Sequence, residues 1–195
     1  MPRRAQTLQL AILGLLEESS MHGYELRKQL NAVLGWGRVL SYGSLYPALK
    51  QLVGAGLLTE ETTTGAGRQR VVYTLTESGE RRFAQLMAEV GPAAYEDESF
   101  GVRMAFFGRT DAEIRLRILE GRRVRLQERL ERIQTQLQAN QRRMDRYAAE
   151  LQRHGAESVE QEMTWLNRLI NAERNGVEFG PVAAPQQYPR PLNQE

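Results

Sequence analysis

The sequence predicts a mainly α-helical protein with one small β-hairpin and a long helical region after it. In three stretches of the first sixty residues, apolar side chains recur at the period of an amphipathic helix. The period then changes to two on either side of a Gly-rich turn, as in paired short strands. Beyond residue 110 a seven-residue apolar repeat begins, which is typical of helices that pack side by side.

The first two helices are short and amphipathic. The first has Thr7 as a candidate N-cap, and the second follows a break at residues 17–23 and ends at Gly35. For the third helix we expect Ser44 as the N-cap. Pro47 would then be the third helical residue, where its missing N–H has no intrahelical partner to lose. The apolar stripe of this helix is Leu45, Leu49, Leu52 and Val53.

Two short strands follow, at residues 59–63 and 70–75, joined by a turn that contains Gly65 and Gly67. Thr76 is then the expected cap of a closing helix. Three helices, a two-stranded hairpin and a closing helix are the order of a winged helix-turn-helix domain. We assign residues 1–90 to this domain and residues 91–110 to a linker with a short buried helix.

The remaining helical region is assigned to residues 111–175 and is predicted to be a coiled-coil-like dimerisation domain. Residues 110–113 have the form of a capping box, and the helix they open is expected to run to His154-Gly155, with a new helix from Ser158. Asn140 falls on the heptad repeat and is expected to fix its register. Residues 176–195 hold four of the seven prolines and no periodicity, which predicts a disordered tail.

An apolar repeat of this length needs a second helix to bury it. That helix is either the one around Trp165 in the same chain or one from another subunit, and the sequence leaves both open. The candidate dimerisation residues are Leu119, Leu126, Leu130, Ile133, Leu137, Met144, Leu151, Val159, Met163, Leu166 and Ile170.

Composition excludes several kinds of chemistry. The 195 residues contain no cysteine, which excludes disulfides, iron–sulfur clusters and thiol catalysis. The two histidines, His22 and His154, are far apart in the sequence, and there is no Gly-rich phosphate loop or Gly-x-Ser-x-Gly motif. We therefore expect no metal, no cofactor and no enzymatic activity. No apolar run approaches the roughly 18–20 residues of a membrane span, so a cytoplasmic location is expected.

The positions of the basic residues matter more than their number. The net charge is only +2, with 10 basic and 8 acidic residues in positions 1–90 and 16 of each in positions 91–195. The third helix turns polar side chains away from its apolar stripe, as a helix in the major groove of DNA does. Arginines in the hairpin turn and before the first helix suit phosphate contacts. The candidate DNA-binding residues are Ser44, Tyr46, Pro47, Lys50, Arg68, Arg70, Arg3 and Arg4.

Residues 10–86 closely resemble the N-terminal domain of PadR-family transcriptional regulators. The similar segments, in order, are Leu10–Leu16, His22–Leu26, Gly43–Leu49, Leu52–Leu58, Gly67-Arg68 and Tyr73–Gly79. Residues 100–175 resemble the longer helical C-terminal domain of one branch of that family. The resemblance implies a homodimeric regulator, most often a repressor, that a small phenolic or drug-like effector releases from DNA.

The resemblance also implies residue roles. It places Tyr46, Pro47 and Lys50 on a recognition helix and Arg68 and Arg70 on a wing, and it implies that Tyr24 anchors the second helix. For an aromatic effector the candidate pocket lies at the dimer centre and is lined by Trp36, Tyr147 and Trp165, with a place in the core as the alternative.

A dimer of this kind is expected to bind a roughly palindromic operator, with two recognition helices about 34 Å apart in successive major grooves. The alternative is a protein-interaction module that docks a protein through the face of Tyr46 and Lys50. Salt dependence separates the two, because DNA binding weakens linearly in log[salt] with the number of phosphates contacted.

Overall fold

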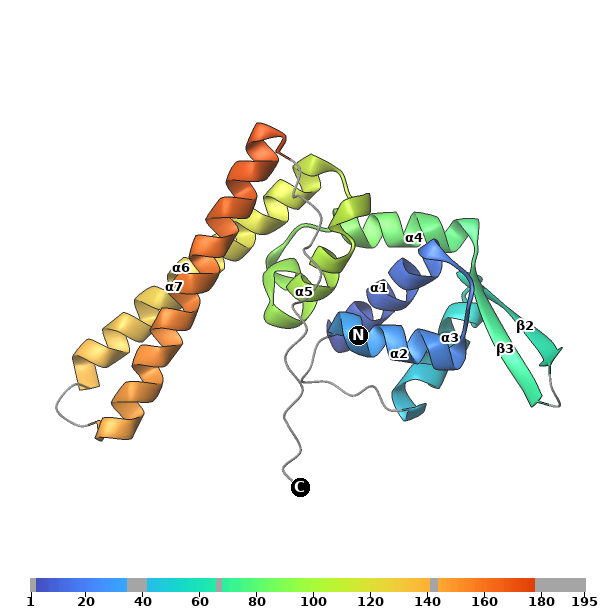
Figure 1. The fold of residues 1–195 in the computed structure, drawn as a ribbon, viewed down its shortest axis with the longest axis horizontal. Helices are drawn as coiled ribbons and strands as arrows, with labels where there is room; N and C mark the ends of the chain where they lie inside the picture. The colour runs from blue at the N-terminus through green and yellow to red at the C-terminus, as the bar shows by residue number, and fades with distance from the viewer. Residues whose placement is uncertain (1–2, 35–41, 66–67, 141–143, 178–195) are drawn as a thin grey trace, which may run out of the picture.

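The computed structural model describes residues 3–34, 42–65, 68–140 and 144–177, and it confirms the mainly helical fold with a small sheet. In the N-terminal part, α1 (Arg3–Glu18), α2 (Gly23–Leu34) and α3 (Tyr42–Gly54) pack together, and α4 (Glu77–Ala88) follows the hairpin of β2 (Leu58–Gly65) and β3 (Arg68–Leu75). Figure 1 shows the hairpin projecting from this bundle at one side and a pair of long helices at the other. The winged helix-turn-helix order is therefore confirmed.

The sheet has a third strand that the sequence analysis missed. β1 (Met21–His22) pairs antiparallel with β3, which gives the order β1-β3-β2, with Met21 opposite Tyr73. The segment was interpreted only as a helix break. Met21 is 2% exposed and Tyr73 is 4% exposed, so burial of both side chains holds this short strand in place.

The third helix, α3, begins earlier than predicted. Since α3 starts at Tyr42, Ser44 lies inside the helix and is not its N-cap, and Pro47 is the sixth helical residue. Pro47 cannot donate to the carbonyl of residue 43, and its ring crowds that carbonyl, at a cost of about 3 kcal/mol. Leu45 and Leu49 are fully buried, and each such side chain contributes roughly 1.5–3 kcal/mol, so the two together offset that loss. The predicted Thr76 cap of α4 is confirmed, because its Oγ1 accepts from the Gly79 N–H at 3.1 Å.

A short helix, α5 (Asp97–Ala105), joins the two halves of the molecule. It follows the 3-10 turn η1 (Pro92–Tyr95) and precedes a second 3-10 turn, η2 (Phe107–Arg109). Val102 and Phe106 belong to the N-terminal core cluster, whereas Phe100 belongs to the C-terminal one. The buried short helix predicted within residues 91–110 is therefore present, and its segment contributes to both cores.

Phe106 is the deepest contact of this segment with the N-terminal bundle. Its ring is 2% exposed and lies edge-on to Phe83, with 5.5 Å between ring centroids. A Cβ placed on Gly14 of α1 would come within 2.5 Å of the ring. Because Gly14 has no side chain, the Phe106 ring can occupy this space.

The C-terminal part is an antiparallel helical hairpin of α6 (Ala112–Asn140) and α7 (Arg146–Asn175) (Figure 1). The prediction that the first of these helices continues to Gly155 is wrong. Asp145 caps α7, with its carboxylate accepting from the N–H groups of Tyr147 and Ala148 at 2.8 and 2.9 Å. The predicted restart at Ser158 lies inside α7, where the Ser158 hydroxyl donates to the His154 carbonyl at 2.8 Å.

The predicted capping box at residues 110–113 is also wrong. The Thr110 hydroxyl donates backwards to the Phe106 carbonyl at 2.9 Å, and α6 begins two residues later at Ala112. The first main-chain bond of the helix runs from the Arg115 N–H to the Asp111 carbonyl, so Asp111 occupies the N-cap position.

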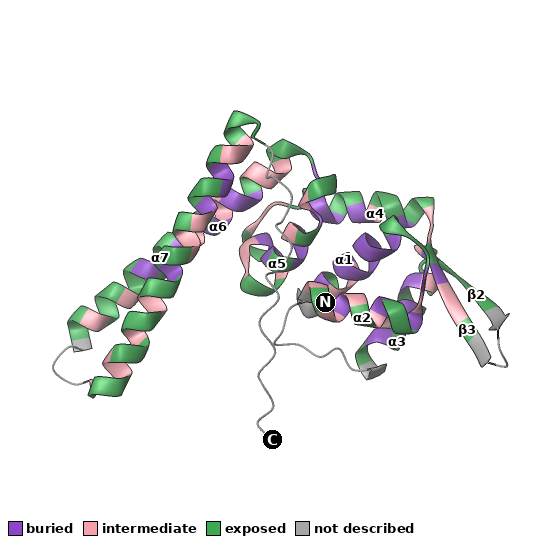
Figure 2. Cartoon of the chain, viewed as in Figure 1, coloured by how far each residue is buried: buried purple, intermediate pink, exposed green. Residues whose placement is uncertain are grey.

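The heptad repeat is buried within one chain over much of its length. Of the two partners left open by the sequence, the helix in the same chain covers six of the candidate dimerisation residues: Leu119, Leu126, Leu130, Val159, Leu166 and Ile170. Ile133, Leu137, Met144 and Met163 are half-buried, and Leu151 is 69% exposed. Figure 2 shows buried positions in the half of the hairpin nearest α5 and exposed or half-buried ones toward its far end. The side chain of Asn140 lies outside the described residues.

Arg122 ties the hairpin to the start of α5. Its guanidinium is 5% exposed and donates to the Asp97 carboxylate at 2.5 Å, to the Tyr95 carbonyl at 2.7 Å and to Glu162 at 2.8 Å. These partners belong to η1, α5 and α7, whereas Arg122 itself belongs to α6. One buried cation therefore fixes four elements relative to one another.

Candidate nucleic-acid interface

A groove of about 840 Å³ lies where α2, α3 and β3 meet. Tyr24 and Lys28 line it from α2, Tyr46 from α3, and Arg70 from β3. The two α2 residues are four apart and so share one face of the helix, and Tyr46 and Lys50 have the same spacing on α3. The groove thus brings together phenols and positive charges from three elements, which is the chemistry that phosphates and base edges require.

The role expected for Tyr24 is not what the structure shows. Its side chain is 70% exposed, so it does not anchor α2 in the core. Tyr24 and Lys28 were therefore missed as candidates for binding. The signal was present in the sequence, because both α2 and α3 carry a tyrosine followed four residues later by a lysine, the only two lysines of the chain.

Tyr46 lies against the start of α2. A Cβ on Gly23 would be 3.3 Å from the Tyr46 Oη and 3.4 Å from the Tyr73 ring, so glycine at this position allows the close approach. Burial raises the pKa of the Tyr73 phenol, and the Glu60 carboxylate raises it further. The Tyr73 phenol is therefore neutral and lies at the bottom of the groove. Tyr46 is 39% exposed and reaches the protein surface.

The two faces of α3 separate as the sequence predicts. Leu45 and Leu49 are fully buried, whereas Ser44, Pro47 and Lys50 are exposed. Contact of these exposed residues with DNA remains a prediction.

The wing places Arg70 at an exposed position of β3, opposite Thr63 of β2. Arg68 starts the same strand, opposite Gly65, but its side chain lies outside the described residues. The same is true of the side chains of Arg3 and Arg4 at the start of α1, and residue Trp36 as a whole lies outside the description.

The other aromatic candidates for an effector pocket do not meet in one chain. Tyr147 is 79% exposed at the start of α7, and Trp165 lies edge-on to Phe100 with 6.3 Å between ring centroids. Eighteen residues separate the two on one helix, which is about 27 Å along its axis. A pocket at the dimer centre that Tyr147 and Trp165 would line stays a prediction.

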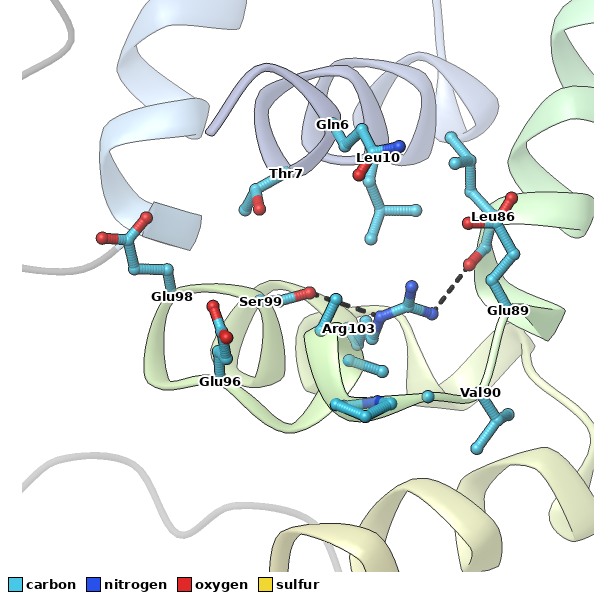
Figure 3. Close-up of a pocket in the computed structure, with 14 residues that line it drawn as sticks. Gln6, Thr7, Leu10, Leu86, Glu89, Val90, Glu96, Glu98, Ser99 and Arg103 are labelled. Atoms are coloured by element: carbon cyan, nitrogen blue, oxygen red, sulfur yellow. Dashed lines mark hydrogen bonds between the residues drawn. The ribbon is translucent and has the colours of Figure 1, made fainter. Parts of the chain in front are cut away.

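A different cavity, of about 340 Å³, lies between α1, the end of α4 and α5 (Figure 3). Arg103 of α5 is 6% exposed and lines it, together with Thr7 and Leu10 of α1. The Arg103 Nη1 donates to the carbonyls of Leu86 and Met87 at 2.7 and 3.0 Å, which are in the last turn of α4.

Arg103 shares this cavity with three glutamates, Glu89, Glu96 and Glu98. Among the described residues it has no ion pair, and its Nη2 has no hydrogen-bond acceptor, while Nε makes a long contact of 3.4 Å with the Ser99 hydroxyl. Burial lowers the pKa of Arg103, against the opposing effects of Glu89 and Tyr95. The Nη2 of Arg103 is therefore available to a ligand that accepts a hydrogen bond.

Residues 12–85 match the Transcriptional regulator PadR-like family. Among curated proteins, the negative transcriptional regulator PadR of Bacillus subtilis (strain 168) is 35% identical over 77 residues, which are 39% of this chain and 42% of that protein. The match thus spans less than half the length of this relative.

The similar solved structures include two of that regulator. Bacillus subtilis PadR in complex with operator DNA has a TM-score of 0.43 at 21% identity, over 85% of this chain and 98% of that one. The same protein in complex with p-coumaric acid has a TM-score of 0.40 at 18% identity, over 89% and 98%. The protein smu.1704 from Streptococcus mutans UA159 has a TM-score of 0.40 at 30% identity, over 46% and 80%.

In the described part of the chain, no helix has the length and hydropathy needed to cross a membrane. The match over residues 12–85 covers the helices and the wing that build the groove. The likeness to the PadR-like family of transcriptional regulators is therefore that of the N-terminal domain, residues 12–85.

Proposed function

We propose that this protein binds double-stranded DNA sequence-specifically and represses transcription. The observation that carries the proposal is the groove of Tyr24, Lys28, Tyr46 and Arg70, which continues onto the exposed face of α3 at Lys50. An α-helix with one buried and one polar face fits the major groove, and the wing then lies along the backbone. The name of the Bacillus subtilis relative, a negative regulator, supports repression.

A homodimer is the second part of the proposal. Tyr147 and Leu151 are 79% and 69% exposed, one turn apart on the outer half of α7, so the hairpin leaves apolar surface that its own chain does not cover. A second copy of the hairpin would bury it. The dimer would then present two α3 helices to a roughly palindromic operator, about 34 Å apart.

We propose the Arg103 cavity as the site for a small aromatic carboxylic acid, although Glu89, Glu96 and Glu98 also line it. Its volume of about 340 Å³ is at the lower end of ligand pockets, which run from about 300 to 1,000 Å³. The carboxylate would pair with the Nη2 of Arg103, and the ring would lie against Leu10. Because α1 and α4 of the winged-helix domain form two of the walls, an occupant there acts on the DNA-binding part directly.

The test is fluorescence anisotropy with DNA from upstream of the protein's own gene and scrambled DNA as the control, over a salt series. We expect tighter binding to the upstream DNA, with log K falling linearly in log[salt]. Replacing Arg68 and Arg70 together by Ala should weaken binding to both DNAs and make the slope shallower. Equal, salt-insensitive binding to both DNAs would favour the alternative, a module that docks a protein partner.

A further inference from the structure

The lysines of this chain are few, and both lie in the proposed DNA-binding surface. Of the 26 basic residues all but Lys28 and Lys50 are arginine. Lys28 lines the groove from α2, and Lys50 is exposed on α3, one turn after Tyr46. Any chemistry that is specific for a primary amine in a side chain therefore acts on this surface and nowhere else along the chain.

Both amines are available to a reagent. Lys28 and Lys50 are exposed, and neither makes a hydrogen bond or an ion pair among the described residues. Many arginines are engaged instead, as Arg115 is with Glu173 and Arg122 with Asp97 and Glu162. An amine becomes a nucleophile on losing its proton, whereas a guanidinium stays charged throughout the physiological range.

We propose that Lys28 and Lys50 are acylation sites through which an activated acyl group, a thioester or an acyl phosphate, weakens DNA binding. The unprotonated Nζ attacks the acyl carbon, a C–N bond forms, and the bond from that carbon to sulfur or to the phosphate oxygen breaks. The thiolate or phosphate leaves and the amine proton passes to solvent, so no redox partner is needed. This inference rests on the proposed function.

The electrostatic effect follows from the charge count. Residues 1–90 carry 10 basic and 8 acidic residues, so acylation of both lysines leaves 8 of each and removes the net positive charge of this half. Each lost phosphate contact lowers the salt slope by about 0.9. At about 0.15 M salt, counterion release alone then weakens binding about fivefold per contact, or about thirtyfold for both.

The experiment treats the full chain with acetyl phosphate in one arm and with acetyl-CoA in the other. Peptide mass mapping locates the adducts, and anisotropy with operator DNA gives the affinity and salt slope before and after. We expect adducts on Lys28 and Lys50, and a slope that is shallower by about 1.8. The two arms show which activated acyl group reacts.

The control is the double variant Lys28→Arg, Lys50→Arg, with its own untreated affinity as the reference. Treatment should change that affinity less than twofold, because the remaining amine is the one at the chain terminus. The inference is overturned if the lysines stay unmodified, if modified protein keeps its slope, or if the double variant loses as much affinity on treatment as the parent. Failure of the untreated chain to bind DNA at all refutes the proposed function instead, whatever the adduct map shows.

Discussion

Replacing Gly14 by Ala should have opposite effects on stability depending on the residue at position 106. In the parent protein, the new Cβ would lie 2.5 Å from the Phe106 ring, far inside van der Waals contact. The ring is 2% exposed and packed against Phe83, so it has little room to move. Overpacking of this kind costs about 1–3 kcal/mol, and only about 1 kcal/mol is regained from the better helix propensity of alanine.

Phe106→Ala alone should destabilise the protein by about 3–5 kcal/mol, because it removes a buried ring and leaves a cavity. In that background Gly14→Ala meets empty space, fills part of the cavity and keeps its helix propensity. We therefore expect it to stabilise Phe106→Ala by about 1 kcal/mol or more. The effect of Gly14→Ala on stability should therefore change from destabilising in the parent protein to stabilising in the Phe106→Ala variant.

Urea denaturation of the four proteins, followed by circular dichroism, measures the cycle. The matched control is Gly101→Ala on α5, where nothing beyond the adjacent residues and the helix's own backbone lies within 4 Å of the new Cβ, so it should stabilise both backgrounds by about 0.5–1 kcal/mol. Additive effects of Gly14→Ala and Phe106→Ala would refute the packing argument. So would an equal gain from Gly14→Ala in both backgrounds.

Three further outcomes are expected. The pKa of Asp97 is raised by burial, but its hydrogen bond to Arg122 and the charges of Arg122 and Arg129 outweigh this and lower it. The stability that the Asp97 carboxylate contributes is therefore complete above the unfolded pKa of about 3.9 and is lost as the pH falls through the folded pKa. In urea titrations, Asp97→Asn should destabilise the protein at pH 7 and should have no effect at low pH. Tyr24→Ala should weaken operator binding at least tenfold in anisotropy with unchanged melting, whereas an unaffected affinity would remove Tyr24 from the interface. Leu151→Ser should shift the mass in light scattering from dimer toward monomer, and an unchanged mass would place the dimer contact elsewhere.

The elements of the N-terminal domain could be predicted because each has a strong local signal. The apolar stripes of α1 and α3, the turn glycines of the hairpin and the Thr76 cap are all properties of neighbouring residues. The start of α3 was misplaced because the prediction followed the preference of Pro47 for the first helical turn. The burial of Leu45 and Leu49, which depends on the whole core, outweighs that local preference. β1 was missed because a strand of two residues is too short to show an alternating pattern of apolar and polar side chains.

The helical hairpin shows a different limit. A seven-residue repeat is the same whether the helix continues or folds back on itself, because both arrangements bury the same stripe. Asp145 was the available signal, as a good N-cap residue followed by a helix-compatible sequence. The helix break was predicted at Gly155 instead. A glycine inside a helix lowers the stability of the helix by only about 1 kcal/mol, so it does not have to end there.

The proposed binding surface could be outlined from the sequence only in part, for a related reason. The sequence separates the core face of α3 from its polar face, but it does not show which residues of α2 lie beside that polar face. Tyr24 follows Gly23, and only the fold brings this turn against Tyr46. Once the fold is known, the shared pattern is visible in the sequence. The tyrosine and lysine on α2 have the same spacing as those on α3.

α5 is where a signal from the C-terminal half would pass to the winged-helix half. Three side chains of this one segment point to three places: Phe106 into the α1 core, Phe100 against Trp165 of α7, and Arg103 to the last carbonyls of α4. Arg122 clamps the start of the helix to the hairpin. A ligand that draws the Arg103 guanidinium toward itself weakens the hold on α4 while both ends of α5 stay fixed. Arg103→Met should therefore abolish the response of DNA binding to aromatic acids, and retention of that response would place the effector outside this cavity.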